Sequence, residues 1–297
     1  MSEWHIRLAR LEDEAAVRAL SAHIWEGDDY VPDTFADWVA DPLGRFYLLF
    51  VAERLAGFGK LTCLAEGEWW LEGLRVHPDF RGQGIARALH NYAVDLAEEI
   101  ASGVLRFATA STNLATHHLA ASTGFMLASR YLLAEAPAAA VPLPAITPDL
   151  FQPALPAEHA AVAAWLSQPA VQQITAGLYE DGWQWFSLLP ALPKLLAAGR
   201  VYTWRGNLGM VIIDPAHTPQ EPDTLWLNLA VAPNQADLPL LLADLRQLAV
   251  HLNKRTLEAK PPALPAMETW LAAAGWKLSE DLQMLVFSRP LPRLSDH

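Results

Sequence analysis

The glycine-rich run Arg81-Gly82-Gln83-Gly84 is the part of this chain best suited to hold an anion. An apolar stretch, Trp69 to Val76, precedes it, and a stretch with helical periodicity, Ile85 to Ile100, follows it. Glycines lack a Cβ, so backbone N–H groups can close on a phosphate, while the arginine and the helix N-terminus add positive potential. This order of strand, glycine-rich turn and helix predicts a site for a pyrophosphate.

Two common phosphate-binding loops do not fit these residues. A P-loop carries a lysine and a hydroxyl residue directly after its last glycine, and neither follows Gly84. A dinucleotide-binding loop carries a third glycine where Arg87 stands, and the chain lacks the alternating strands and helices that surround such a loop. A tight strand-to-helix turn that binds no ligand is the alternative on these residues alone.

Two glutamates on the preceding stretch are candidates for a catalytic base. An ammonium cannot attack a carbonyl until it loses a proton, and the attacked oxygen then needs hydrogen-bond donors. Because side chains alternate along a strand, we expect Glu72 on the same face as Leu74 and Val76. Glu68 shares that face by parity, although we expect it to be solvated at the start of the strand. The alternative role for Glu72 is to bind the substrate amine without accepting a proton.

The segment from Trp25 to Trp38 is rich in acidic and aromatic residues. Six carboxylates stand between Glu26 and Asp41, and no basic residue interrupts them. Such a segment attracts a cationic amine, to which aromatic faces add cation–π attraction. The candidate substrate-binding residues are Trp25, Glu26, Asp29 and Tyr30. The alternative is the solvated acidic start of a helix.

Composition excludes several classes of function. With a net charge of −12 and no basic stripe, the chain of 297 residues is not expected to bind nucleic acid. No apolar run approaches the roughly 20 residues that span a bilayer, and the N-terminus has no signal-peptide pattern, so we expect a cytoplasmic protein without a membrane partner. The single cysteine, Cys63, excludes an internal disulfide, and the ten histidines are scattered, so we expect no metal site.

The order of elements in the N-terminal half predicts an α/β domain with a mixed sheet. Strands are expected at residues 4–8, 46–52, 55–65, 69–76, 104–109 and 126–134, and helices at residues 13–22, 85–100 and 112–122. The Ala- and Pro-rich stretch from Glu135 to Glu158 has almost no charge and is typical of a linker. We therefore expect one domain at residues 1–136, a linker at 137–157 and a second domain at 158–297.

The second half of the chain repeats the order of the first. Residues 70–78 align with residues 225–233 at an offset of 155, and residues 119–125 align with residues 271–276. Two matched landmarks in the same order favour a duplication over a chance similarity of apolar strands.

The two copies differ at the glycine-rich loop. Aligned from the shared proline, Arg81, Gly82, Gly84 and Glu72 become Ala236, Asp237, Pro239 and Leu227. An aspartate repels a phosphate and a proline removes an N–H donor, so we expect the second domain not to bind the ligand. Its expected role is to shape or cover a substrate cleft, or to form an interface.

The run Val-x-Pro-x-x-Arg-Gly-x-Gly-Ile-Ala from Val76, with Asn113 and the later Gly124-Phe125, resembles the GCN5-related N-acetyltransferase (GNAT) superfamily. The resemblance covers residues 3–135. Together with the degenerate repeat, it implies an α/β fold of two tandem GNAT-like domains, each a mixed central sheet flanked by helices. It also implies acetyl-CoA as the acyl donor and an amine as the acceptor, with direct attack in a ternary complex.

The resemblance implies roles for several residues. In this superfamily the loop amides hold the pyrophosphate of coenzyme A, the strand before the loop pairs its backbone with the pantetheine, and two later positions touch the cofactor arm. The corresponding residues here are Arg81, Gly82, Gln83, Gly84, Ile85 and Ala86 for the pyrophosphate, Leu74 and Val76 for the pantetheine, and Asn113 and Thr116 for the arm. The amide of Val76 is also a candidate oxyanion donor.

The resemblance also bears on the base and the acid. Polyamine acetyltransferases of the superfamily carry a carboxylate proposed as base at the position of Glu72, and the base of histone acetyltransferases corresponds to Glu68. Many members carry a tyrosine that protonates the leaving thiolate at the position of Ala120, so this acid is missing here. Water could supply the proton, because a thiol is a tolerable leaving group. The other candidates for the acid are Tyr30, Tyr131 and His117.

Two short strings are also similar to histidine N-acetyltransferase-like proteins, which join an active domain to a degenerate one. They are Asp-Tyr-x-Pro at residues 29–32, followed by Trp38, and residues 71–76. This similarity implies a small-molecule amine or a free amino acid as acceptor, with Arg75 or Arg130 as partner of its carboxylate. A protein acetyltransferase would need an open peptide groove, which a covering second domain obstructs. The alternative from another class is a catalytically silent, coenzyme A-binding regulatory or scaffold protein. The sequence specifies no oligomeric state.

Overall fold

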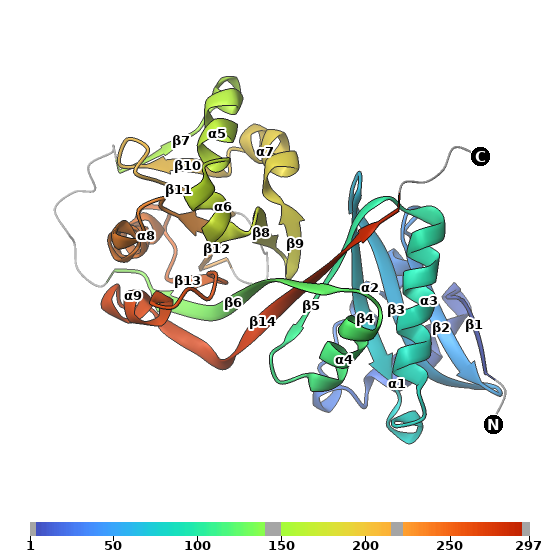
Figure 1. Ribbon diagram of the computed structural model, residues 1–297. Helices are drawn as coiled ribbons and strands as arrows, with labels where there is room; N and C mark the ends of the chain where they lie inside the picture. Colours follow the sequence, from blue (N-terminus) through green and yellow to red (C-terminus); the bar gives the residue numbers. More distant parts are fainter. Residues whose placement is uncertain (1–3, 140–149, 215–221, 293–297) are drawn as a thin grey trace. The chain divides into compact units, whose positions relative to one another are not determined.

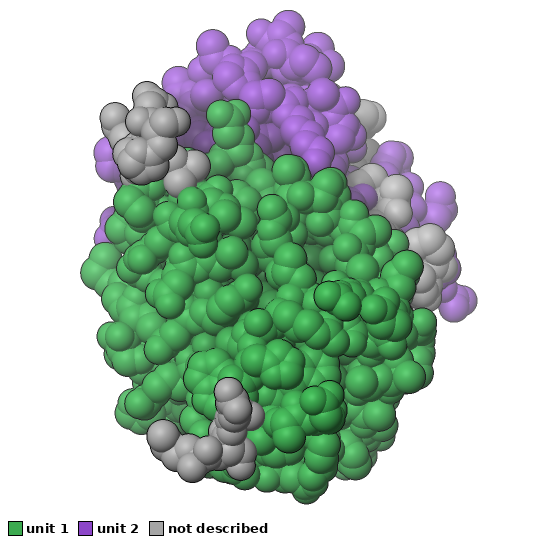
Figure 2. All heavy atoms as spheres, turned by 90° about the vertical axis from the view of Figure 1, so that its right-hand side faces the viewer, with its two compact units in different colours: residues 1–107, 114–126, 287–297 green, residues 108–113, 127–286 purple. Residues whose placement is uncertain are grey.

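The computed structural model describes residues 4–139, 150–214 and 222–292 of the chain. By internal contacts the chain divides into two compact units, which Figure 2 draws in separate colours. Unit 1 comprises residues 1–107, 114–126 and 287–297, and unit 2 comprises residues 108–113 and 127–286. The two units therefore interleave along the chain.

Unit 1 is built around a mixed sheet (Figure 1). Its strands are, in spatial order, β1 (Trp4–Leu8), β2 (Arg45–Val51), β3 (Arg54–Ala65), β4 (Glu68–Val76) and β5 (Gly103–Ala110), of which the last three residues belong to unit 2. The first four strands pair antiparallel with their neighbours, whereas β5 is parallel to β4. Its helices are α1 (Glu14–Ser21), α2 (Val31–Ala40), α3 (Ile85–Ile100) and α4 (Leu114–Ser122), and its 3-10 helices are η1 (Leu11–Asp13), η2 (Trp25–Gly27) and η3 (Pro78–Phe80).

Helices cover both faces of this sheet. The buried residues are Val17, Leu20, Phe35, Trp38, Phe46, Leu48 and Phe58 on the face of α1 and α2, and Tyr47, Leu49, Ala56, Ile85, Leu89 and Ala93 on the face of α3. Consecutive apolar residues of β2 therefore alternate between two cores, as expected of a strand that is covered on both sides.

The fourth strand, β4, contains a bulge at Gly73. Phe58 pairs with Arg75 and Lys60 pairs with Glu72, so two residues of β4 lie opposite a single residue of β3. Gly73 has φ +67°, a conformation that residues with a Cβ rarely adopt. A Cβ at this position would also meet the ring of Trp38 at 2.6 Å.

The bulge shifts the alternation of side chains by one residue. Glu72 and Arg75 lie opposite Lys60 and Phe58 and share the face of α1 and α2. The residues Leu74 and Val76 instead pack with the core under α3. The prediction that Glu72 shares a face with Leu74 and Val76 is therefore wrong, because strict alternation does not hold across an extra residue.

Unit 2 also contains mixed β-sheet (Figure 1). Its strands are, in spatial order, β14 (Lys277–Leu291), β6 (Met126–Pro137), β13 (Thr256–Ala259), β12 (Thr224–Val231), β11 (Gly209–Asp214), β10 (Val201–Trp204) and β7 (Phe151–Pro153). A separate hairpin is formed by β8 (Leu178–Asp181) and β9 (Gln184–Ser187). The helices are α5 (His159–Leu166), α6 (Pro169–Thr175), α7 (Leu188–Ala197), α8 (Leu238–His251) and α9 (Met267–Ala273), with the 3-10 helices η4 (Pro156–Glu158) and η5 (Gln235–Asp237).

The two halves of the chain have the same architecture. The elements β12, η5, α8, β13, α9 and β14 follow one another as β4, η3, α3, β5, α4 and β6 do, and β12 is parallel to β13 as β4 is to β5. The predicted fold class is confirmed, because the chain forms two tandem α/β domains, each with a mixed central sheet flanked by helices.

The last strand of each repeat, β6 or β14, crosses between the two units instead of staying within one. The strand β6 pairs with β13 inside unit 2, and Phe287–Leu291 of β14 belong to unit 1. Two parts of the expected linker lie in strands, since β6 extends to Pro137 and β7 pairs with β10. Residues 140–149, which include Pro142, Pro144 and Pro148, lie outside the described residues. The boundaries at 1–136, 137–157 and 158–297 stay a prediction.

Candidate active site

The glycine-rich loop lies between η3 and α3 in unit 1. Residues 81–84 form an exposed turn, in which Gly82 has φ +73° and Gly84 has φ +84°. A Cβ added at either glycine would meet nothing within 4 Å, so the backbone conformation, and not crowding by the protein, requires glycine there. The space beside the loop is therefore open to a ligand.

The start of α3 completes this loop. The first amides of a helix have no partner within it and attract anions, and here they belong to Ile85 and Ala86. The side chain of Gln83 donates to the carbonyl of Asp79 at 2.8 Å, which fixes the turn from inside. The guanidinium-bearing Arg81 is exposed. The residues predicted to hold a pyrophosphate thus lie together in this exposed turn and the start of α3.

The backbone of β4 after the bulge is the second feature of the site. In the described residues β4 and β5 pair only from Glu68–Val104 to Trp70–Arg106, although β4 continues to Val76. The amide of His77 donates to the carbonyl of Ala56 on β3 at 2.9 Å. Since backbone donors of a strand alternate between its two edges, the amides of Leu74 and Val76 point away from β3. An extended ligand can pair with such donors.

The carboxylate of Glu72 ends a chain of polar contacts from β3. Thr62 donates its hydroxyl to Glu72 Oε1 in a short hydrogen bond. The ammonium of Lys60 donates to Thr62 Oγ1 at 3.0 Å and to Asp41 Oδ2 at 2.6 Å. Glu72 is half-buried and Lys60 is buried. No sequence pattern indicates this chain of contacts, because it depends on the register of β3 against β4.

The second candidate base, Glu68, has a different environment. It is 5% exposed, and its Oε2 lies 3.0 Å from Arg106 Nη1. The expectation that Glu68 is solvated at the start of the strand is therefore wrong. This charge-assisted contact with a buried guanidinium links β4 to β5. This environment favours Glu72 over Glu68 as base.

The predicted substrate segment places two aromatic rings over Arg75. The Cζ atom of Arg75 lies 4.4 Å from the ring centroid of Trp25 and 5.4 Å from that of Tyr30. Trp25 and Tyr30 stack with centroids 6.5 Å apart, and Trp25 is 61% exposed. The residues Trp25 and Glu26 both have positive φ, 44° and 59°. Such backbone strain is often found where a segment has a function.

Two of the six acidic side chains are already engaged. Asp29 is buried and holds Arg75 through both of its oxygens, at 2.9 and 3.3 Å, and Asp41 holds Lys60. Asp29 is therefore not positioned to bind a substrate amine, nor Arg75 a substrate carboxylate. Glu26 is exposed, as are Asp28, Asp33 and Asp37. The sequence signal that could have indicated these two ion pairs is the presence of Lys60 and Arg75 within largely apolar strands.

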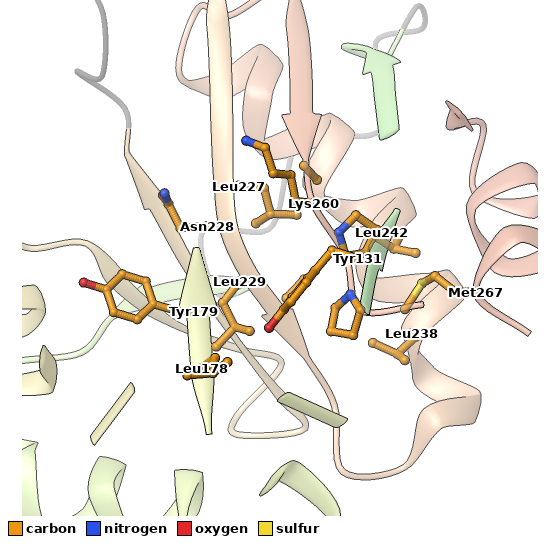
Figure 3. A pocket seen from close by; sticks show the side chains of 14 residues that line it. Tyr131, Leu178, Tyr179, Leu227, Asn228, Leu229, Leu238, Leu242, Lys260 and Met267 are labelled. Carbon is orange, nitrogen blue, oxygen red and sulfur yellow. The ribbon is translucent and has the colours of Figure 1, made fainter. Parts of the chain in front are cut away.

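The candidates for the acid lie in three different surroundings. Ala120, at the position of the family's tyrosine, is fully buried on α4. Tyr131 is on β6 and lines a cavity of unit 2 (Figure 3). The ring of His117 packs at a tilt against that of Phe287, with centroids 5.7 Å apart. Burial raises the pKa of Tyr30, against the opposing effect of Arg75, while the nearby charge of Glu72 raises it further.

The residues expected at the cofactor arm lie near the end of β5. The amide side chain of Asn113 donates to Thr109 Oγ1 at 3.1 Å, and the residue is exposed. Thr116 is half-buried on α4. Arg130, the other expected partner of a substrate carboxylate, is exposed on β6 in unit 2.

Other chemistries find little support in the described parts of the chain. Among those residues, no three His, Cys, Asp or Glu side chains gather as a metal site. The helices described there include none that is both long and apolar enough to cross a membrane. Cys63 is half-buried on β3, and burial raises the pKa of its thiol, which disfavours a thiolate nucleophile.

Solved structures place this fold in a known class. A GCN5-related N-acetyltransferase from Sphaerobacter thermophilus superposes with a TM-score of 0.63 at 14% identity, over 99% of this chain and 98% of that one. A tandem GNAT protein from the clavulanic acid biosynthesis pathway gives a TM-score of 0.56 at 16% identity, over 99% of this chain and 100% of that one. The chain thus has the fold of a tandem acetyltransferase.

Sequence comparison specifies the family. Residues 10–125 match the model of the acetyltransferase (GNAT) family. A histidine N-acetyltransferase of Oreochromis niloticus is 30% identical over 92 residues, which are 31% of this chain and 27% of that protein. One of Scomber australasicus is 29% identical over 92 residues, with the same shares. The chain thus matches about a quarter of the length of these relatives.

Proposed function

We propose that unit 1 transfers an acetyl group from acetyl-CoA to the amine of a small molecule or an amino acid. The observation that carries this proposal is the joining of the anion-binding turn at residues 81–84 to a strand whose amides point away from β3. The first suits a pyrophosphate and the second an extended pantetheine. The match of residues 10–125 to the GNAT family model supports the same assignment.

In this proposal the donor is held mainly by backbone. The amides around Gly82, Gln83 and Gly84, with those of Ile85 and Ala86, bind the pyrophosphate beside Arg81. The backbone of Leu74 and Val76 pairs with the pantetheine. Asn113 and Thr116 contact the arm of the cofactor, as in the family.

The proposed reaction is a direct attack. Glu72 accepts a proton from the substrate ammonium, directly or through water, and the neutral amine attacks the thioester carbonyl. A β4 amide that points away from β3, that of Leu74 or Val76, donates to the oxyanion. The nitrogen then loses its second proton to water as the C–S bond breaks, and the thiolate takes a proton from water or from Tyr30. The raised pKa of Cys63 argues against an acyl-enzyme.

The proposed acceptor binds near the aromatic pair of Trp25 and Tyr30. Their faces suit a cationic or aromatic amine, and the exposed carboxylate of Glu26 adds attraction. Because the curated relatives are histidine N-acetyltransferases, histidine is the first acceptor to test. The ion pair of Asp29 with Arg75 shapes the floor under these rings.

The test measures thiol release from acetyl-CoA with a panel of amines and the product mass. We expect turnover with at least one amine, and a fall of about 10²- to 10⁴-fold in kcat for Glu72→Gln. Glu66→Gln, an exposed carboxylate in the turn before β4, serves as the matched control and should keep full activity. Full turnover in Glu72→Gln combined with Glu68→Gln would contradict the assignment of the base.

A second candidate is a silent coenzyme A-binding regulator or scaffold. The observation that favours it is Ala120, which leaves no proton donor at the family's usual position on α4. Calorimetry separates the two functions. Tight binding of acetyl-CoA without thiol release for any amine of the panel supports the regulator, and release with any of them supports the enzyme.

A further inference from the structure

We propose that Thr62 and Lys60 position the carboxylate of Glu72 for proton transfer. They do so through a chain of hydrogen bonds in which Lys60 donates to Thr62 and Thr62 donates to Glu72. The proposal rests on the proposed function, since it concerns the base of that reaction. Its observation is the series of contacts from Asp41 through Lys60 and Thr62 to Glu72.

The direction of the chain follows from the chemistry of its members. An ammonium only donates hydrogen bonds, so Thr62 Oγ1 accepts in its 3.0 Å contact with Lys60 Nζ. A threonine hydroxyl has one proton, and that proton is directed to Glu72 Oε1. The hydroxyl therefore cannot turn away from Glu72 without losing its contact with one neighbour.

The far end of the chain is fixed by packing and backbone. The side chain of Lys60 is 4% exposed, and its Nζ lies 5.5 Å from the ring centroid of Trp38. Asp41 Oδ1 accepts from the amides of Leu43 and Gly44, at 3.1 and 2.9 Å. Burial works to raise the pKa of Asp41, but the bonds from Lys60 and the two amides outweigh it and lower the pKa.

Two further titratable groups, Tyr30 and Arg75, lie nearby, since the charges of Glu72 and Arg75 both act on the pKa of Tyr30. Tyr30 precedes α2, and Arg75 follows the bulge on β4. Arg75 is held by Asp29, as Lys60 is held by Asp41. Each cation near the base thus has its own aspartate, and the link to Glu72 from β3 runs through the neutral hydroxyl of Thr62.

The functional consequence is a fixed direction for the carboxylate. A glutamate side chain has three rotatable bonds, and a catalytic group that is misplaced by about 1 Å can lose about 100-fold in rate. A carboxylate held by Thr62 needs no reordering before it accepts a proton. We therefore expect the chain to act on kcat and on the pH profile more than on substrate binding.

The first experiment compares Thr62→Val, which removes the hydroxyl at nearly constant shape, with Thr62→Ser, which keeps it. We expect Thr62→Val to lower kcat about 10- to 100-fold with KM for acetyl-CoA unchanged. The acidic limb of its kcat profile should move to higher pH, because the carboxylate loses a donor that favours its ionised form. Thr62→Ser should restore both. Thr203→Val, which removes a strand hydroxyl in unit 2, is the matched control.

A double variant tests the same chain of hydrogen bonds without changing Thr62. Lys60→Met with Asp41→Asn removes both charges together, so that neither is left buried alone, and should lower kcat about 3- to 10-fold while Thr62 stays in place. Thermal melting shows whether each variant is folded.

The outcomes separate this proposal from the function on which it rests. If Glu72→Gln is inactive while Thr62→Val and the double variant keep the wild-type kcat and pH profile, the positioning role is overturned and the enzyme stands. If Thr62→Ser loses as much as Thr62→Val, packing and not the hydroxyl is responsible, and the role is again overturned. Full activity in Glu72→Gln would instead remove the base, and this proposal with it.

Discussion

The glycine-rich loop of unit 1 and its counterpart in unit 2 join the same two kinds of element in different ways. In unit 1, a turn of four residues separates η3 from α3, and Gly82 and Gly84 give it positive φ. In unit 2, α8 begins at Leu238 directly after η5 ends at Asp237, which has helical angles of φ −85° and ψ −13°. Unit 2 therefore has no turn at this place that could surround an anion. This difference supports the proposal that the turn of unit 1, with its two glycines, serves a ligand.

The space beyond the parallel strands of unit 2 is filled by the chain itself. The strands β12 and β13 pair from Thr224–Thr256 to Leu227–Ala259, and β12 then continues alone to Val231. Figure 3 shows the side chains around the cavity there, among them Tyr131, Leu238, Leu242 and Met267. About 20 Å³ is open to the centre of a water molecule, which is room for one water and not for a pantetheine.

Both units keep the bulge, but only unit 1 keeps its glycine. In unit 2, Ile212 pairs with Leu229 and Ile213 with Leu227, so Asn228 is the extra residue. It stands at the position of Gly73, 155 residues later. The side chain of Asn228 is buried and donates to the carbonyl of Glu180 at 2.9 Å, whereas Gly73 leaves its space to Trp38. The bulge is common to both units, and the glycine occurs in unit 1, for which we propose the site.

The largest expected effect tests whether the region of unit 2 that corresponds to the site is a packed core. It is a change in the free energy of unfolding on substitution of Lys260. Its ammonium is 2.9 Å from Glu180, and both side chains are almost fully buried. Lys260→Met should lower the free energy of unfolding by about 3–5 kcal/mol, because it leaves a buried charge alone. Lys260→Met with Glu180→Gln should recover most of that loss. Urea unfolding gives these values, and an unchanged midpoint for the single variant would show that the cavity of unit 2 is not a tightly packed core.

The next effect concerns acetyl-CoA binding when the loop of unit 1 is given the residues of unit 2. The triple variant Arg81→Ala, Gly82→Asp, Gly84→Pro should weaken binding by about 100-fold or more, since it adds a carboxylate, removes an amide and forbids the φ of Gly84. Calorimetric titration measures the Kd. Gly206→Asp, at a positive-φ turn of unit 2 with open space around it, is the matched control and should leave the Kd unchanged. Equal weakening in both would mean that the loop has no specific part in binding.

The sequence was sufficient for features that depend on local pattern and insufficient for those that depend on register. The helix at Ile85–Ile100 and the duplication are visible in periodicity and in repeated strings. The bulge at Gly73 is not, because one extra residue leaves the apolar pattern of β4 almost unchanged. The partners Asp29–Arg75 and Glu68–Arg106 are 46 and 38 residues apart, and only the sheet brings them together.

A tenfold effect is expected at the bulge of unit 1. Gly73→Ala places a methyl group 2.6 Å from the ring of Trp38, which must move with α2. We expect a fall of about tenfold in kcat/KM for the acceptor, because Trp38 packs on Tyr30 and over Lys60. Gly67→Ala has a similar positive φ and no atom within 4 Å, so it carries the same backbone strain without the collision. Steady-state kinetics on both variants would reveal whether the collision or the strain is responsible.

The smallest effect concerns acid stability, in which the two units should differ at one helix position. His90 of α3 is buried, its Nε2 lies 2.8 Å from Thr123 Oγ1, and Leu245 occupies the corresponding place in α8. Burial, together with the nearby charge of Arg289, lowers the pKa of His90 to about 4. As the pH falls below about 6.5, the unfolded chain takes up a proton that the folded chain does not. Stability should therefore fall with pH until about pH 4.

The variant His90→Leu gives unit 1 the residue of unit 2 and isolates this contribution from that of the carboxylates. The wild-type chain should lose about 1 kcal/mol more than the variant between about pH 7.5 and pH 5.5, since the imidazole titrates only in the unfolded state over that range. Urea unfolding at the two pH values measures the difference, and His118→Leu, at an exposed position of α4, is the control. Equal losses of stability in wild type and His90→Leu would mean that His90 is protonated in the folded chain. The core under α3 would then tolerate a charge at the position that Leu245 occupies in α8.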